Sequence, residues 1–178
     1  VRNTPALTFV WFLWSLPSEK GGDMKLEPWY VTGLCDGEAS FSVSFNWRQK
    51  LNVGIETRPS FSVTLSARDL ELIRALRNYF RCGAIRFSRF DNTYKFEVRS
   101  IVDLNQKIIP HFRKYPLSGS KARDFQAFAR ICEMVKANLH LNKKHLREII
   151  ELAYQMNPSG KRRLAKEELL RELGEVKV

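Results

Sequence analysis

The sequence predicts an α+β domain in which a helix, two strands, a second helix and two more strands are followed by helices. The main observation is a change of period, because residues 29–38 suit a helix, whereas residues 40–48 alternate between polar and apolar side chains. The chain has 178 residues and 44% of them are hydrophobic, which is enough for a core. We therefore expect an N-terminal extension over residues 1–23 and one domain over residues 24–178 with a C-terminal helical tail.

The remaining elements follow from hydrophobic spacing and from turn residues. Pro59 is expected to open the second strand after a polar connection over residues 49–58. Cys82-Gly83 is expected to end the second helix, and the segment from Asn157 to Gly160 to break the helical tail. The expected elements are a helix over 29–38, strands over 40–48 and 59–66, a helix over 70–80, strands over 84–90 and 93–99, and helices over 102–112 and 121–137.

The N-terminal extension contains a strongly apolar run from Ala6 to Leu16. This run is much shorter than the roughly 20 residues that span a bilayer. The residues from Pro17 to Lys20 are a poor signal-peptide cleavage site. We interpret the extension as a segment that packs on the body of the protein or as read-through from upstream coding sequence, and we expect no membrane partner.

The formal net charge of +11 favours a polyanionic partner, because each Lys or Arg docked on a phosphate releases a counterion. Charge alone leaves nucleic acid and an anionic membrane surface as alternatives. Neither a disulfide framework nor a zinc site is expected, since the cysteines and histidines lack the necessary spacing. The cysteines are expected to be buried in a reduced compartment, and the histidines to be ordinary surface or helix residues. These residues are Cys35, Cys82, Cys132, His111, His140 and His145.

The segment WYVTGLCDGEASF, from Trp29 to Phe41, joins the first helix to the first strand. Gly33 and Gly37 are one helical turn apart and would let a second helix approach closely. Asp36 and Glu38 cannot point the same way on a helix, so one carboxylate can project towards the ligand-facing sheet. The alternative is an amphipathic helix whose glycines serve intramolecular packing and whose acids face water.

This segment resembles the LAGLIDADG signature of homing endonucleases. Val31 to Ala39 stand in for its nine letters. Three of them match the letters, namely Gly33, Leu34 and Asp36, whereas Cys35, Gly37 and Glu38 are common replacements and Ala39 replaces the terminal glycine. Residues 61–87 and 115–135 also look like parts of the family, so that the resemblance covers roughly residues 28–157.

The resemblance implies the αββαββα LAGLIDADG fold, with a four-stranded antiparallel DNA-binding sheet in each subunit. It implies a site-specific double-strand DNA endonuclease, of the intron or intein type, that hydrolyses phosphodiester bonds with divalent metal. Because the sequence shows one motif, we expect a homodimer on a long near-palindromic target, with Gly33 and Gly37 at the dimer interface. The protein would act inside the cell wherever the host DNA is, in cytoplasm and nucleoid or in an organelle.

The resemblance also implies the catalytic residues, Glu38 and Lys121. Glu38 is the expected metal-binding carboxylate, with the Gly37 carbonyl as a second ligand. Asp36 is expected to be structural and is the second choice for the metal. Oxygen ligands suit Mg²⁺, and other divalent cations fit as well. Lys121 would orient water or stabilise charge on the phosphate; the alternative is a solvated lysine at a helix start.

Outward positions of the strands are the candidate DNA contacts, because a twisted antiparallel sheet can present alternate side chains to base edges. Arg86 and Arg99 are the best candidates for reading guanine. Leu65 stands where the family often has a polar residue, and Ser66 and Arg68 are both candidates for that role. The DNA-binding set is Ser42, Ser44, Asn46, Arg48, Ser62, Thr64, Arg86, Ser88, Lys95, Glu97 and Arg99.

Two other functions fit parts of the sequence. The same fold serves RNA-splicing maturases, whose partner is the host intron RNA, and non-cleaving DNA-binding regulators. A regulator usually adds a helix-turn-helix domain, and the tail after Asn138 is short for one. The third alternative is a basic interaction module without chemistry, in which the serine-rich strand is only a wet sheet face.

Overall fold

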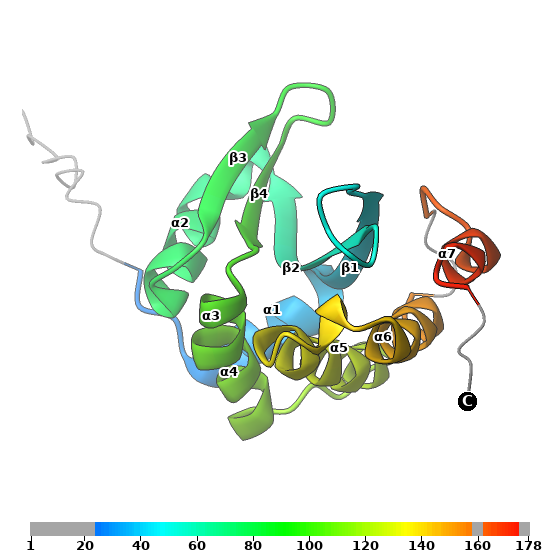
Figure 1. Cartoon of the computed structure of the whole chain (residues 1–178). Helices are drawn as coiled ribbons and strands as arrows, with labels where there is room; N and C mark the ends of the chain where they lie inside the picture. The colour runs from blue at the N-terminus through cyan, green and yellow to red at the C-terminus, as the bar shows by residue number, and fades with distance from the viewer. Residues whose placement is uncertain (1–23, 158–161, 175–178) are drawn as a thin grey trace, which may run out of the picture.

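The computed structural model describes residues 24–157 and 162–174 (Figure 1), so the extension over residues 1–23 lies outside the described residues. The order of the elements confirms the expected α+β, αββαββα arrangement. The elements are α1 (Pro28–Glu38), β1 (Ala39–Trp47), β2 (Ile55–Ser66), η1 (Ala67–Asp69), α2 (Leu70–Phe80), β3 (Ala84–Ser88), β4 (Thr93–Val98), α3 (Ile101–Asp103), the π-helical segment η2 (Leu104–Ile108), α4 (Ile109–Lys114), α5 (Lys121–Lys136), η3 (Leu139–Leu141), α6 (Lys143–Gln155) and α7 (Lys166–Glu172).

The four strands form one antiparallel sheet in the order β1-β2-β4-β3. Figure 1 shows α1, α2 and α5 on one side of the sheet, where they contact its strands, while no helix in the described part of the chain covers the other side. The alternation of β1 follows from this arrangement, because Phe41, Val43 and Phe45 are buried beneath the helices and the serines between them are exposed.

β2 begins at Ile55, so the prediction that it starts at Pro59 is wrong. The missing amide hydrogen of a proline normally excludes it from a central strand. Here Pro59 pairs with Val43 of β1, and the Val43 carbonyl points to the free edge of the sheet, where it accepts from Arg162. The backbone nitrogen of Pro59 therefore faces away from β1, towards the β4 side of β2. Pairing of β2 with β4 begins only at Phe61, so the proline costs the sheet no hydrogen bond between strands.

The helix expected over residues 102–112 is three consecutive segments, α3, η2 and α4. Pro110 lies in the first turn of α4, directly after the π-helical segment. The Ile109 amide bonds back to the Leu104 carbonyl, which is π-type spacing. Because the junction falls just before Pro110, the proline stands where a helix tolerates it.

Phe41 connects the α1–β1 junction to the centre of the core. Its ring lies 5.3 Å from the rings of Phe61 and Phe128, and 5.5 Å from those of Phe112 and Phe125, measured between centroids. These neighbours come from β2, α4 and α5. The point at which α1 turns into β1 is thus held by aromatic packing from three elements.

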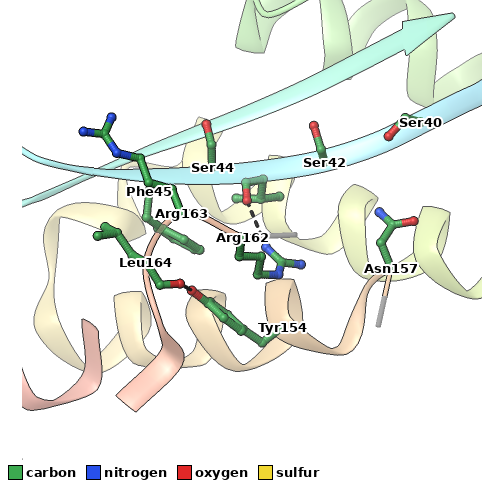
Figure 2. Close-up of a pocket in the computed structure, with 10 residues that line it drawn as sticks. Ser40, Ser42, Ser44, Phe45, Tyr154, Asn157, Arg162, Arg163 and Leu164 are labelled. Carbon is green, nitrogen blue, oxygen red and sulfur yellow. Dashed lines mark hydrogen bonds between the residues drawn. The ribbon is translucent and has the colours of Figure 1, made fainter. Parts of the chain in front are cut away.

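The free edge of β1 is covered by side chains from the C-terminal region. Asn157 Nδ2 donates to the Phe41 carbonyl (2.8 Å), and Arg162 donates to the carbonyls of Val43 (3.3 Å) and Met156 (3.0 Å). The Arg162 guanidinium also lies 4.4 Å from the centroid of the Tyr154 ring. A cavity of about 540 Å³ lies between β1 and this region (Figure 2). These contacts close a sheet edge that would otherwise offer unpaired backbone groups to another chain.

Candidate active site and nucleic-acid interface

Glu38 is the last residue of α1, and its side chain is exposed. Cys35 and Ala39 on either side of it are buried, so the chain is anchored before and after this position. Within residues 24–157 and 162–174, no hydrogen bond or ion pair engages the Glu38 carboxylate. The carboxylate therefore projects from the junction between helix and sheet and is free to bind a ligand.

Asp36, in contrast, is held by the loop that precedes α5. Its carboxylate accepts hydrogen bonds from the backbone amides of Ser118 (2.8 Å) and Gly119 (3.2 Å). A Cβ atom on Gly119 would lie 3.2 Å from Asp36 Oδ1, which is tighter than an ordinary contact, so the glycine allows this close approach. These contacts agree with the structural role expected for Asp36.

Lys121 binds the C-terminal end of α1 rather than extending into solvent. Its Nζ donates to the main-chain carbonyls of Asp36 (2.7 Å) and Gly37 (2.5 Å). Carbonyl groups at a helix C-terminus carry partial negative charge, which an ammonium group stabilises. The structure thus brings Lys121 to the main chain beside Glu38, and both the lysine and the expected metal ligand, the Gly37 carbonyl, belong to one cluster.

The donor set of this cluster fits a hard cation only in part. The Glu38 carboxylate and the Gly37 carbonyl are both oxygen donors, as Mg²⁺ prefers. However, the described residues contain no group of three His, Cys, Asp or Glu side chains that could hold a metal ion. A cation bound here would need further oxygen ligands from a second chain, from phosphate or from water.

Gly33 and Gly37 pack against nothing in residues 24–157 and 162–174, so the described residues give no support to an intramolecular packing role. Both are exposed, and a Cβ atom built on either of them would meet nothing within 4 Å. Tyr30, one turn before Gly33, is 50% exposed. The glycine face of α1 is therefore open in the described part of the chain, and a second helix could approach it.

The predicted DNA-binding residues lie along the uncovered face of the sheet. Strand register places Ser42 opposite Ser60, Thr64 opposite Lys95, and Arg86 opposite the same lysine. Their exposure differs: Ser42, Ser44, Arg48, Arg86 and Arg99 are exposed, Asn46, Thr64, Ser88 and Lys95 are half-buried, and Ser62 and Glu97 are each only 6% exposed.

Sequence reasoning missed the outward residues at the start of β2. Arg58 is exposed and lies opposite Ser44, and Glu56 lies opposite Asn46. Both fall within the polar connection predicted over residues 49–58, because Pro59 is expected to open the strand. The alternation of Ile55 and Thr57, which are buried, with these charged residues was the available signal.

Leu65 packs against the core and cannot supply the polar side chain that the family often has at this position. The two candidates for that role are Ser66 and Arg68. Ser66 lies opposite Thr93 and on the same face as Thr64, whereas Arg68 is exposed in η1. Ser66 is therefore the one that shares the sheet face with the other polar side chains.

Glu97 collects three cations on this face. Arg99 contacts its carboxylate with Nε (3.0 Å) and Nη2 (3.1 Å), Lys95 Nζ lies 3.2 Å away and Arg86 Nη1 3.9 Å away. Ser60 Oγ also donates to it (3.2 Å). Burial alone would raise the pKa of Glu97, but the hydrogen bonds and charges of Lys95 and Arg99 outweigh it, and its pKa lies below the ordinary value.

His111 lies in α4, as the expectation of a surface or helix residue allows, but it is buried rather than on the surface. Thr32 Oγ1 donates to the Tyr115 carbonyl (3.0 Å) and therefore accepts from His111 Nε2 (3.2 Å), while the Tyr79 hydroxyl donates to Nδ1 (3.0 Å). Burial lowers the pKa of His111 to about 4. A neutral imidazole thus ties α1 to α2, α4 and the loop that holds Asp36.

The cysteines agree with the expected interior positions. Cys35 and Cys132 are buried, Cys82 is half-buried, and all three are free thiols. Burial raises the pKa of Cys35 to about 12, so this thiol is not a nucleophile at neutral pH. None of the helices in the described residues is long and apolar enough to cross a membrane.

Fold and site together define an αββαββα protein with an acidic helix end beside a basic, uncovered sheet. The model of the LAGLIDADG endonuclease family matches residues 31–132. This chain belongs to the LAGLIDADG endonuclease family.

Two curated relatives illustrate the similarity. Probable intron-encoded endonuclease 3 of Neurospora crassa is 32% identical over 135 residues, which are 75% of this chain and 25% of that protein. Homing endonuclease I-ApeII of Aeropyrum pernix is 27% identical over 148 residues, 80% of this chain and 87% of that protein. The chain thus spans about a quarter of the length of the first relative and most of the length of the second.

Solved structures agree with the fold. The crystal structure of the homing endonuclease I-TnaI superimposes with a TM-score of 0.74 at 34% identity, covering 84% of this chain and 97% of that chain. The structure of I-SmaMI bound to cleaved DNA superimposes with a TM-score of 0.72 at 30% identity, covering 78% of this chain and 45% of the other.

Proposed function

We propose that this chain is a site-specific, metal-dependent double-strand DNA endonuclease of the homing type. The observation that carries the proposal is the exposed Glu38 carboxylate, which stands between an open glycine face and a basic sheet face. Family membership makes nuclease chemistry the expected use of such a carboxylate. DNA bound along the sheet would bring a phosphodiester to Glu38, because this residue directly precedes β1.

Glu38 and the Gly37 carbonyl would hold the divalent cation, which we propose is Mg²⁺. A bound cation of this kind activates water and neutralises charge on the phosphate and on the departing 3′ oxygen. Asp36 is the poorer ligand, because its carboxylate would first have to give up the amides of Ser118 and Gly119. These contacts support Glu38 as the metal carboxylate and a structural role for Asp36.

Lys121 would act next to this site. Its ammonium group is already bound to the Gly37 carbonyl, where a divalent cation would repel it. In the DNA complex Lys121 would therefore turn from this carbonyl towards the phosphate, where its charge stabilises the transition state, or towards the attacking water. Its position at the start of α5 places the amine beside the carbonyls of Asp36 and Gly37, next to the proposed metal ligand.

A second acidic helix is required to cut the second strand. For this 178-residue chain we propose that it comes from an identical copy, with α1 packed against α1 through Gly33 and Gly37. The partners would then be double-stranded DNA and a second copy of the chain. Each subunit would supply one Glu38 to a near-palindromic target.

The test is cleavage of duplex DNA that contains the intron-insertion locus, with Mg²⁺ present. Glu38→Gln should slow cleavage at least about a hundredfold, because even residues that merely support a metal ligand affect activity 10- to 100-fold. The free energy of unfolding should change by less than about 0.5 kcal/mol, since the side chain is exposed and no hydrogen bond or ion pair engages it in the described part of the chain. Equal cleavage by wild type and variant would refute the assignment.

Binding of the host intron RNA tests the maturase alternative. The endonuclease proposal predicts that the duplex target competes with the RNA and binds more tightly. Tighter binding of the RNA, together with unaltered DNA after incubation with Mg²⁺, would favour the maturase. Tight DNA binding without cleavage would favour a regulator.

A further inference from the structure

The Glu97 cluster consists of Glu97 and the three cations Arg86, Lys95 and Arg99, and its carboxylate is buried although it lies on the open face of the sheet. The carboxylate lies in the middle of the outer sheet face, yet its side chain is only 5% exposed, while those of Arg86, Lys95 and Arg99 are 63%, 42% and 53% exposed. The three cations cover the anion and expose their own donors. A carboxylate that is so little exposed beneath three cations is poorly placed to accept a hydrogen bond from a base.

The contact with Arg99 fixes the plane of its guanidinium. Nε and Nη2 of Arg99 both face the Glu97 carboxylate. A guanidinium has five N–H donors in a rigid fork, so this contact leaves the edge formed by Nη1 and the second Nη2 hydrogen free. That edge matches the paired O6 and N7 acceptors of guanine in the major groove.

Neighbouring side chains favour the same arrangement. Register places Glu97 between Ser62 of β2 and Ala84 of β3, both of which are too short to cover the carboxylate. Ser60 Oγ binds the same carboxylate oxygen as Lys95 and Arg99. The short Ser60 side chain thus binds the Glu97 carboxylate, and the longer side chains of Arg86, Lys95 and Arg99 contact and cover it.

Charge explains why an acid is needed on a face that binds a polyanion. Three cations gathered within contact distance of one point would repel one another, and each would sample many rotamers without a fixed partner. One carboxylate among them leaves the cluster positively charged while fixing their directions. Fixed donors discriminate between bases better than mobile ones, because less conformational freedom is lost on binding.

We propose that Glu97 is a positioning residue for base recognition, which orients Arg99 and gathers Arg86 without touching the DNA. This inference rests on the proposed DNA-binding function of the sheet. It replaces the prediction that Glu97 itself contacts DNA.

The test is selection of binding sites from a library of randomised duplexes, using the full chain without divalent cation and sequencing the bound fraction. Wild type should enrich a motif. Glu97→Gln keeps the size of the side chain and Arg99→Lys keeps the charge, yet both should lose roughly tenfold in base preference at the same base pair, since a good bidentate contact discriminates by at least that much. Non-specific affinity of Glu97→Gln should not fall, because no cation is removed.

A double-mutant cycle and a charge control complete the design. The variant with both substitutions should show no further loss at that base pair, because the two residues act through one contact. Glu56→Gln removes the same charge from the same face, beneath Arg48 and Arg58, and should leave preference at the Arg99 base pair unchanged.

Three outcomes would overturn the inference. A Glu97→Gln motif identical to that of wild type would remove the positioning role. Additive losses at different base pairs would show that Glu97 contacts a base of its own. A wild type that enriches no motif would overturn the endonuclease proposal as well, whereas the first two outcomes leave that proposal intact.

Discussion

Asp36 and Glu38 lie two residues apart at the end of α1, yet one carboxylate is hydrogen-bonded and the other is exposed. Asp36 binds two backbone amides of the loop before α5, while no hydrogen bond or ion pair of the described residues engages the exposed Glu38. The difference follows from helix geometry, since residues two apart lie on different faces. Asp36 can therefore stabilise the site, while the Glu38 carboxylate remains available to bind a ligand.

This contrast predicts opposite effects of removing each acid. Asp36→Ala should lower the free energy of unfolding by about 1 kcal/mol, because the backbone amides of Ser118 and Gly119, in an exposed loop, lose a charged acceptor that water replaces only in part. Glu38→Ala should change it by less than about 0.5 kcal/mol. Urea denaturation of both variants checks the prediction, and equal destabilisation by the two substitutions would contradict it.

His111 predicts a pH dependence of stability. Its pKa is about 4 in the folded chain and has an ordinary value of 6.5, so between these values the unfolded chain binds a proton that the folded chain does not. Stability from this group is complete above pH 6.5 and is lost as the pH falls towards 4. The free energy of unfolding should fall by about 2 kcal/mol between pH 7 and pH 5.

The matched control is His111→Gln, which cannot titrate in this range. Urea denaturation of wild type and variant at pH 7 and pH 5 isolates the histidine from other groups. The wild type should lose about 2 kcal/mol more than the variant over this interval. An equal loss in both proteins would show that other residues cause the acid sensitivity.

Some residue-scale features were predictable and others were not. The position of Glu38 at a helix end could be predicted from the local change of period, whereas Lys121 was indicated only by the resemblance to the family. The partners of Asp36 lie more than 80 positions away in the sequence, and no local pattern indicates that pairing. Burial of His111 likewise depends on three separate elements meeting.

At the scale of elements, the limits of prediction follow from pairing between strands. The expected start of β2 failed at Pro59 because the tolerance of a proline depends on which side of the strand has a neighbour. Most outward positions were predictable, since they follow from alternation along single strands, but those at the start of β2 were missed together with its first residues. Cooperation among the outward residues, as in the Glu97 cluster, arises only from the register between strands.

Helix α1 combines a buried face with an open glycine face, which predicts a separation between folding and assembly. Gly33→Ala should raise the stability of the isolated subunit by about 0.5–1 kcal/mol, because glycine is unfavourable within a helix and the added methyl group meets no atom of the described residues within 4 Å. Gly33→Leu should also fold, yet it should prevent the close approach of two α1 helices.

The two Gly33 variants are distinguished by thermal denaturation at low protein concentration and by sedimentation in the presence of duplex target. Wild type should sediment as a complex of two chains per duplex, and Gly33→Leu as one chain or none. A Leu variant that still assembles in pairs would mean that α1 is not the dimer interface.

For the whole molecule, the net charge of +11 and the position of the uncovered sheet decide how DNA is attracted. If duplex DNA lies along this sheet, its phosphates must approach cations on the rim of the face, such as Arg58, and counterions are released. Affinity then depends on salt in proportion to the number of phosphates contacted. A basic module that binds without this geometry would show a shallower dependence.

The logarithm of the association constant should therefore fall linearly with the logarithm of salt concentration, by roughly 0.9 for each phosphate contact. A protein that makes about 6–10 contacts loses roughly 10³- to 10⁵-fold in affinity between about 50 and 200 mM salt. Fluorescence anisotropy with Glu38→Gln, which leaves the duplex intact, measures this slope. Arg58→Gln should reduce it by about one contact, whereas Arg130→Gln, on the helix layer beside Glu148, should leave it unchanged. A slope close to zero, or an equal response to the two substitutions, would place the DNA somewhere other than the sheet.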